Sequence, residues 1–164
     1  MQDLIPAAQK LGALLKDRHE TVAVAESSTG GLISAALLSV PGASAYFIGG
    51  AVVYTLKARR AMLDVQDSAF AGIKSVNEEG ALILARAARD RFAVTWSVSE
   101  IGASGPTGNR YGDPAGHGCI AVAGVVERSI TVETGSTDRV ANMRAFAAAA
   151  LDLLTQSIAA ARRH

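Results

Sequence analysis

The fold is decided by residues 21–31, which read TVAVA followed directly by ESSTGG. The first five residues are small or β-branched and predict a buried strand, whereas the next six are rich in hydroxyl groups and end in Gly30 and Gly31. Open α/β sheets bind ligands beyond the carboxyl ends of their strands, where a following helix offers free backbone N–H groups to anions. The segment therefore predicts a functional turn with Ser27 beside Glu26.

The rest of the chain alternates between helical and strand-like patterns. Strands are predicted at residues 21–25, 51–54, 92–101, 118–123 and 128–134, and helices at residues 4–15, 32–38, 57–63, 79–91 and 138–162. The 164 residues fit one domain, and 49% of them are apolar while only 5% are aromatic. This composition favours a sheet covered by helices. We therefore predict a single domain over residues 1–164, a three-layer α/β/α sandwich around a mixed, mostly parallel sheet.

Composition also argues against several classes of function. A net charge of +1 lacks the strong positive field of a protein that grips nucleic acid, so no nucleic-acid partner is expected. Polar residues interrupt the N-terminal segment, so neither a signal peptide nor a membrane span is expected, and the protein is predicted to be cytoplasmic with no membrane partner. No group of His, Cys and carboxylate residues has metal-ligand spacing, so no metal site is expected.

A second glycine-rich strand exit reads GASGPTG at residues 102–108. It lacks the Gly-Lys-Ser/Thr ending of a P-loop and the glycine spacing of a dinucleotide site, so neither ATP nor NAD is indicated and no cofactor is expected. Its backbone amides and the hydroxyls of Ser104 and Thr107 suit a phosphate or carbonyl oxygen, although a plain tight turn remains an alternative. Arg139, at the start of the last helix, either closes a phosphate site or forms a surface ion pair.

Ser27 would act as a nucleophile only with a partner that accepts its proton. The alternative is that Ser28 or Thr29 caps the following helix while Ser27 fills the turn. His117 stands between two glycines and is interpreted as a loop residue, and no Gly-x-Ser-x-Gly motif is present. Lysine is the other candidate base.

Four candidate residues, Ser44, Tyr54, Lys57 and Arg59, lie around the second predicted strand and just after it. If the chain is extended at Lys57, residues two positions apart share a face, whereas in a helix they point about 200° apart. In a helix, Lys57 and Arg59 would then not serve one site. The alternative is that both belong to a solvated helix start.

Five short motifs span nearly the whole chain, in the order AESSTGG (25–31), PGASAYF (41–47), VY (53–54), GP (105–106) and DR (138–139). Together they resemble the CinA C-terminal domain family. The resemblance implies nicotinamide-nucleotide amidohydrolase activity, which converts nicotinamide mononucleotide and water to nicotinate mononucleotide and ammonia. The implied partner is a small-molecule nucleotide substrate.

The resemblance also implies roles for individual residues. Ser27 corresponds to the nucleophile, with Ser44, Tyr54 and a lysine completing a serine-lysine site. The family's lysine falls five residues after the tyrosine, where this chain has Arg59, and the nearest lysine is Lys57. Arginine stays protonated and cannot act as a general base. The alternative is therefore a catalytically weakened or non-enzymatic nucleotide-binding, competence-associated protein.

Substrate binding is assigned to seven residues near the two glycine-rich turns: Glu26, Thr29, Gly30, Gly31, Ser104, Gly105 and Arg139. The Gly30-Gly31 helix start and Arg139 are expected to hold a phosphate, and backbone amides near Gly30 or Gly105 an oxyanion. A homo-oligomer is also expected, because a chain so rich in apolar residues has enough apolar surface to bury a subunit interface.

Overall fold

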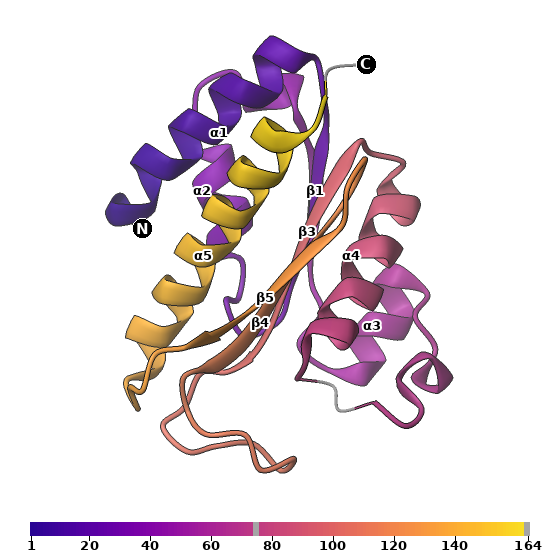
Figure 1. Cartoon of the computed structure of the whole chain (residues 1–164), viewed down its shortest axis with the longest axis vertical. Helices are drawn as coiled ribbons and strands as arrows, with labels where there is room; N and C mark the ends of the chain where they lie inside the picture. The colour runs from indigo at the N-terminus through magenta and orange to yellow at the C-terminus, as the bar shows by residue number, and fades with distance from the viewer. Residues whose placement is uncertain (74–75, 163–164) are drawn as a thin grey trace.

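The computed structural model describes residues 1–73 and 76–162. Five strands form one sheet between two layers of helices (Figure 1). The strands are β1 Val22–Glu26, β2 Phe47–Val52, β3 Trp96–Ala103, β4 His117–Ala123 and β5 Arg128–Glu133. The α-helices are α1 Ile5–Arg18, α2 Leu32–Leu38, α3 Leu56–Leu63, α4 Glu78–Phe92 and α5 Arg139–Ala160. Short 3-10 helices occur at η1 Gln2–Leu4, η2 Ala43–Ala45 and η3 Asp67–Phe70.

The strand order across the sheet is β2-β1-β3-β4-β5. β1 pairs in parallel with β2 and β3, whereas β4 is antiparallel to both β3 and β5. Four strands thus run in one direction and β4 alone opposes them. The predicted α/β/α sandwich with a mixed, mostly parallel sheet is confirmed.

The predicted strand at 92–101 starts too early. Phe92 is the last residue of α4, and Ala93 ends the helix in a left-handed conformation with φ of 51°. β3 therefore begins at Trp96 and continues to Ala103. Alternating polarity does not separate the end of an amphipathic helix from the start of a strand, because both patterns mix apolar and polar residues.

The predicted strand at 51–54 starts too late. β2 already begins at Phe47, and Gly49 and Gly50 pair with Ala23 and Val24 of β1. A Cβ at Gly49 would lie 2.6 Å from the ring of Phe92, so the strand is packed too closely for a side chain at this position. Glycine lowers strand propensity, and this tertiary contact overrides that local preference.

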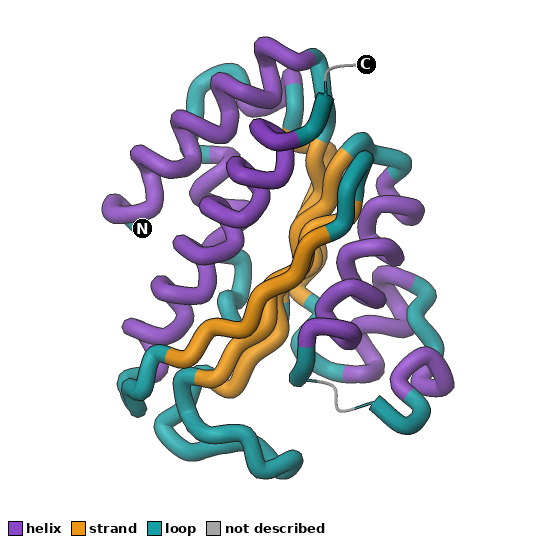
Figure 2. The backbone as a smooth tube through the Cα atoms, in the orientation of Figure 1, coloured by secondary structure: helices purple, strands orange, loops and turns teal. Residues whose placement is uncertain are grey.

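The two faces of the sheet bury separate apolar clusters. Helices α1, α2 and α5 cover one face, where Leu11, Ile33 and Phe146 are fully buried, and α3 and α4 cover the other, where Leu84 lies beneath the sheet (Figures 1 and 2). The carboxyl ends of β1, β2 and β3 lie at the lower end of the sheet in Figure 1, beside the long loop that joins β3 to β4. Ligand sites of such sheets occur at this end.

Within residues 1–73 and 76–162, no helix combines the length and apolar character needed to cross a membrane. In the same two ranges, His, Cys, Asp and Glu side chains do not gather in threes as a metal site requires. The expectation of a homo-oligomer stays a prediction.

Phe146 of α5 packs against two glycines that lie side by side on neighbouring strands of the sheet. Gly102 of β3 and Gly118 of β4 are paired in register, so their missing side chains would point to the same face. A Cβ at Gly118 would lie 2.8 Å from the ring of Phe146, and one at Gly102 would lie 2.7 Å from it. The two glycines let α5 approach the sheet next to the strand exits.

Gly118→Ala should lower the free energy of unfolding by about 1–3 kcal/mol, because the added methyl group collides with the Phe146 ring in a close-packed core. Urea denaturation measures the change. In the double variant Gly118→Ala, Phe146→Leu the smaller side chain makes room, so the two costs should not add. Strictly additive costs would show that the methyl group and the ring do not meet.

Candidate functional site

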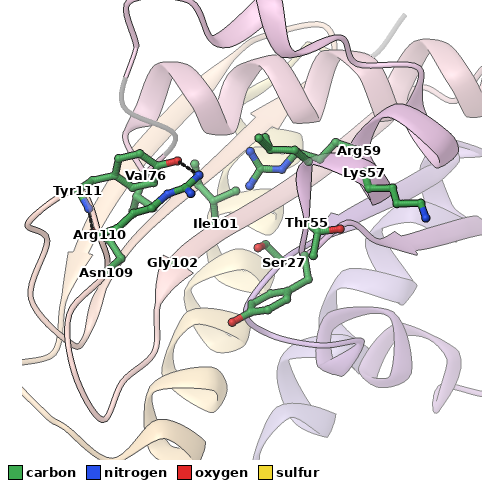
Figure 3. A pocket seen from close by; sticks show the side chains of 12 residues that line it. Ser27, Thr55, Lys57, Arg59, Val76, Ile101, Gly102, Asn109, Arg110 and Tyr111 are labelled. Carbon is green, nitrogen blue, oxygen red and sulfur yellow. Dashed lines mark hydrogen bonds between the residues drawn. The ribbon is translucent and has the colours of Figure 1, made fainter.

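A pocket of about 510 Å³ opens where β1, β2 and β3 end (Figure 3). Its wall is formed by Ser27 after β1, residues 54–57 and Arg59 after β2, Ile101 and Gly102 of β3, the loop residues 109–111, and Val76. A second cavity of about 210 Å³ adjoins it, and the two share Tyr54, Gly102 and Asn109. The volume of the larger pocket, alone or together with the second cavity, is typical of small-molecule sites.

Ser27 has its side chain in the larger pocket although the residue is only 6% exposed. Its backbone N–H donates to Glu100 Oε2 at 3.0 Å, which fixes the main chain of the turn. The Ser27 hydroxyl makes no hydrogen bond to any other described residue, so it is free to meet a ligand. Ser27 thus lies where a ligand in the pocket can contact its hydroxyl group.

Glu26 is turned away from the pocket and holds the start of α2. Its carboxylate accepts from the backbone N–H groups of Gly31 at 3.2 Å, Ile33 at 2.8 Å and Ser34 at 3.0 Å, and from the Ser34 hydroxyl at 2.7 Å. The expected phosphate site at the Gly30-Gly31 helix start is therefore wrong for this structure, because the amides needed for it already bind Glu26. The Gly30 N–H also donates within the turn, to the Ser27 carbonyl.

Thr29 is also fully buried and joins Glu26 to a second carboxyl group, that of Glu100 in β3. Its hydroxyl lies 2.9 Å from Glu26 Oε1 and 2.8 Å from Glu100 Oε2. Glu26 and Thr29 therefore support the turn from within, and the assignment of these two residues to substrate contact is corrected. Neither Gly30 nor Gly31 lines either pocket.

A hydroxyl group has one hydrogen and cannot donate to two carboxylates at once. Two carboxyl groups this close to one hydroxyl group favour a proton on one of them, which can then donate to the Thr29 oxygen. Burial raises the pKa of Glu100, and the hydrogen bonds from Ser27, Ser28 and Thr29 only partly oppose this effect. We assign the proton to Glu100. This residue was missed by the sequence analysis, although a charged residue inside an apolar strand was a visible signal.

Glu100→Gln should change the free energy of unfolding by less than about 1 kcal/mol, whereas Glu100→Ala should lower it by more than about 3 kcal/mol. The amide replaces a protonated carboxyl group with similar donors and acceptors, while alanine leaves several buried groups around Ser27 and Thr29 unpaired. Chemical denaturation of both variants measures the difference. Equal losses would mean that Glu100 is charged in the folded protein.

The same assignment predicts a pH dependence. A carboxyl group whose pKa is raised on folding binds more protons in the folded state, so its contribution is present at low pH and is lost as pH rises through the raised pKa. The free energy of unfolding of the wild type should therefore contain a component that falls as the pH rises from the usual pKa of a glutamate to the raised pKa of Glu100. Glu100→Gln should lack that component, and an identical pH profile for both proteins would contradict the assignment.

Tyr54, Lys57 and Arg59 all line the same pocket as Ser27. Lys57 and Arg59 lie in the first part of α3, which begins at Leu56 with the hydroxyl of Thr55 as its cap. Figure 3 shows the Lys57 amine pointing away from Ser27 and the Arg59 guanidinium turned into the pocket. The helical alternative of the sequence analysis therefore holds, and the two side chains diverge. The alternative of a solvated helix start is correct for Lys57, which is exposed, but wrong for Arg59, which is only 6% exposed.

Arg59 is a buried cation. Its Nε donates to the Val53 carbonyl at 3.4 Å, its guanidinium lies 5.1 Å from the centre of the Phe70 ring, and its Nη1 has no hydrogen-bond partner among the described residues. Burial lowers the pKa of Arg59, and nearby Tyr111 only partly offsets this effect. Arginine nevertheless remains charged, so the pocket holds a permanent positive charge.

The second cavity contains three of the residues assigned to substrate binding: Ser104, Gly105 and Arg139. Arg139, the first residue of α5, donates to the Gly105 carbonyl at 2.5 Å and lies 3.4 Å from the Tyr54 hydroxyl. The buried hydroxyl of Ser104 has no partner among the described residues. This cavity can therefore hold a polar or anionic group beside the Ser27 pocket.

Ser44 is not brought to the site. It lies in η2 before β2, and β2 runs parallel to β1, so Ser44 is at the end of the sheet opposite Ser27. β1 is five residues long, which at about 3.3 Å per residue places the two ends of the sheet about 16 Å apart. The sequence does not specify whether these two strands pair in parallel. Because they do, the expectation that Ser27 and Ser44 meet within one chain is wrong.

His117 is the first residue of β4, so its interpretation as a loop residue is wrong, and it does not line either pocket. Its Nδ1 contacts Glu133, and its Nε2 lies 3.3 Å from the Val76 carbonyl and 3.8 Å from Asp113. Burial alone would lower the pKa of His117, but these partners outweigh it and raise the pKa. His117 is therefore not a base for Ser27.

The fold and the site define an α/β/α domain whose free serine and two arginine-bearing cavities meet at the carboxyl ends of parallel strands. Comparison with known proteins identifies the family: the model of the CinA C-terminal domain matches residues 5–158, and the chain belongs to this family. A CinA-like protein of Myxococcus xanthus is 41% identical over 151 residues, and one of Salinibacter ruber is 37% identical over 142 residues.

These two matches cover 90% and 87% of this chain but only 35% and 34% of the relatives. The chain thus spans about a third of the length of the curated relatives it matches. Among solved structures, the competence/damage inducible protein CihA of Agrobacterium tumefaciens superposes with a TM-score of 0.88 at 28% identity, covering 96% of each chain. The competence damage-inducible protein A of Klebsiella pneumoniae has a TM-score of 0.91 at 22% identity over 97% of this chain and 99% of that one, which supports the fold.

Proposed function

We propose that this chain hydrolyses the carboxamide of nicotinamide mononucleotide, giving nicotinate mononucleotide and ammonia. The observation that carries the proposal is the unpaired Ser27 hydroxyl inside a pocket of nucleotide size, at the strand exit where the chain carries the AESSTGG motif. The resemblance to CinA C-terminal domains supplies the substrate. The cavity at Arg139 and Ser104 supplies a place for the 5′-phosphate beside the pocket.

In the proposed reaction, Ser27 Oγ attacks the amide carbon and its proton leaves for a base. Arg59 is the positive group that faces the developing oxyanion. As the tetrahedral intermediate collapses, the protonated base gives the proton to the amide nitrogen, ammonia leaves, and an ester remains on Ser27. Water then hydrolyses this ester to the carboxylate and frees the serine. Of the described residues that line the pocket, Lys57 is the one that carries an amine, so it is the candidate base after its side chain turns toward Ser27.

Purified protein should release ammonia and nicotinate mononucleotide from nicotinamide mononucleotide, and Ser27→Ala should abolish this activity because the acyl acceptor is lost. Ser44→Ala should keep the wild-type rate, because Ser44 lies at the far end of the sheet. Turnover by the Ser27→Ala protein would remove Ser27 as the nucleophile. A loss of activity in Ser44→Ala would mean that Ser44 acts at the site of another copy.

A second candidate function is nucleotide binding with little or no turnover, in a competence-associated role. It is favoured by Arg59, because the guanidinium occupies the pocket position where an amine would be needed and cannot take the proton of Ser27. Loss of proton transfer typically reduces a rate by about 10²–10⁴-fold while binding survives. Calorimetric binding of nicotinamide mononucleotide without ammonia release at high protein concentration would favour this alternative.

Arg59→Lys should raise the rate of ammonia release at least tenfold, because it places a titratable amine on the pocket side of α3. Arg60→Lys is the matched control. Arg60 is the next residue of the same helix, but it is exposed and paired with Asp67 at 2.6 Å, so its replacement should not change the rate. An unchanged or lower rate for Arg59→Lys would show that the missing amine does not limit this chain.

A further inference from the structure

Every charged residue that lines the larger pocket is basic. These residues are Lys57, Arg59 and Arg110, and no described carboxylate contributes to the wall. The nearby acid Glu100 is fully buried beneath the turn, where the groups of Ser27 to Thr29 surround its oxygens. The pocket therefore has a positive charge that its own wall does not neutralise.

Arg59 is the most important of these cations because it is buried without an acidic partner. No described carboxylate lies within ion-pair distance of its guanidinium, its Nη1 is unpartnered, and its Nε makes only the long contact to Val53. Burying a charge without a counter-charge is energetically unfavourable. A protein that keeps such a group facing a pocket regains that energy when an anion binds there.

Arg110 adds a second cation from the opposite wall. It lies in the loop between β3 and β4, where its Nη2 donates to the Tyr111 hydroxyl at 2.9 Å and its guanidinium lies 5.1 Å from the centre of the Tyr111 ring. Figure 3 shows the guanidinium groups of Arg59 and Arg110 both turned toward the part of the pocket at Ile101. Both line the same cavity as Ser27.

We propose that Arg59 and Arg110 form an anion subsite beside Ser27, and that this subsite makes the pocket bind the carboxylate of nicotinate mononucleotide more tightly than the carboxamide of nicotinamide mononucleotide. The inference rests on the proposed function, which places the 5′-phosphate at Arg139 and the substituent of the pyridine ring at Ser27. The chain is then a stronger binder of the acid than of the amide, and any turnover is slowed by retained product.

The chemical basis is the difference between the two groups. A carboxylate accepts two hydrogen bonds from the fork of a guanidinium, whereas a carboxamide offers one acceptor and turns an NH₂ donor toward the same donors. Hydrogen bonds to charged groups are stronger than those between neutral groups. The acid should therefore bind at least tenfold more tightly than the amide, which corresponds to about 1.4 kcal/mol or more.

Titration calorimetry of the full chain with both nucleotides tests the proposal. Wild type should prefer the acid at least tenfold, and Arg59→Met should reduce the ratio of the two affinities toward one. Arg139→Met is the matched control and should weaken both ligands by a similar factor, leaving the ratio intact. Equal affinities in the wild type, tighter binding of the amide, or a preference that survives Arg59→Met would overturn the proposal.

A second experiment keeps the subsite testable if neither nucleotide binds, in which case the proposed function fails. Free nicotinate and nicotinamide, at matched millimolar concentrations, differ only in the group that the subsite reads. Nicotinate should raise the Tm of wild type and of Arg139→Met more than nicotinamide does, and this difference should vanish in Arg59→Met. No such difference in the wild type would overturn the anion subsite, whatever the nucleotides do.

Arg59→Met also gives a readout that needs no ligand. Replacing a buried, unpaired charge by an apolar side chain of similar length is often neutral or stabilising. The variant should therefore have a Tm equal to or above that of the wild type in a buffer with few anions. A large loss of Tm would show that Arg59 is already neutralised within the fold, and would contradict the subsite.

Discussion

Two buried carboxyl groups hold the turn on which the site depends. Glu26 accepts hydrogen bonds from the backbone amides at the start of α2, and Glu100 accepts them from the amides of Ser27 and Thr29. The hydroxyl of Thr29 lies between the two acids and contacts both. This network ties the end of β1 to β3 and to α2. It keeps the main chain of Ser27 fixed and leaves the Ser27 hydroxyl facing the pocket. The acids beside Ser27 thus act as scaffolding, and the charge in the pocket comes from Lys57, Arg59 and Arg110.

Local patterns predicted much of the fold. The strand at 21–25, the helix at 32–38, the hairpin of β4 and β5 and the long last helix lie within a few residues of their expected bounds, since each has a clear periodicity or cap. The start of β2 could not be predicted, because Gly49 and Gly50 have low strand propensity and join the sheet by pairing with Ala23 and Val24 of β1.

The site was predicted in part, for a similar reason. Ser27, Tyr54, Lys57 and Arg59 follow strand ends, and parallel pairing brings such residues together. Ser44 precedes its strand, so the same pairing carries it to the opposite end. Glu26 contacts only nearby residues, from Thr29 to Ser34, but its position beside the turn does not show whether it faces a ligand or the start of α2. The role of Glu100 depends on contacts with Ser27 and Thr29, more than seventy positions away, which no local pattern contains.

A crystal structure of the protein with nicotinate mononucleotide bound would test the central claim most directly, namely that the Ser27 pocket recognises an acid through Arg59. The account predicts the pyridine carboxylate within hydrogen-bonding distance of the Arg59 guanidinium, its carbon about 3–3.5 Å from Ser27 Oγ, and the phosphate at Arg139. A nucleotide bound elsewhere, or bound with its phosphate on Arg59 and its carboxylate in solvent, would contradict the account.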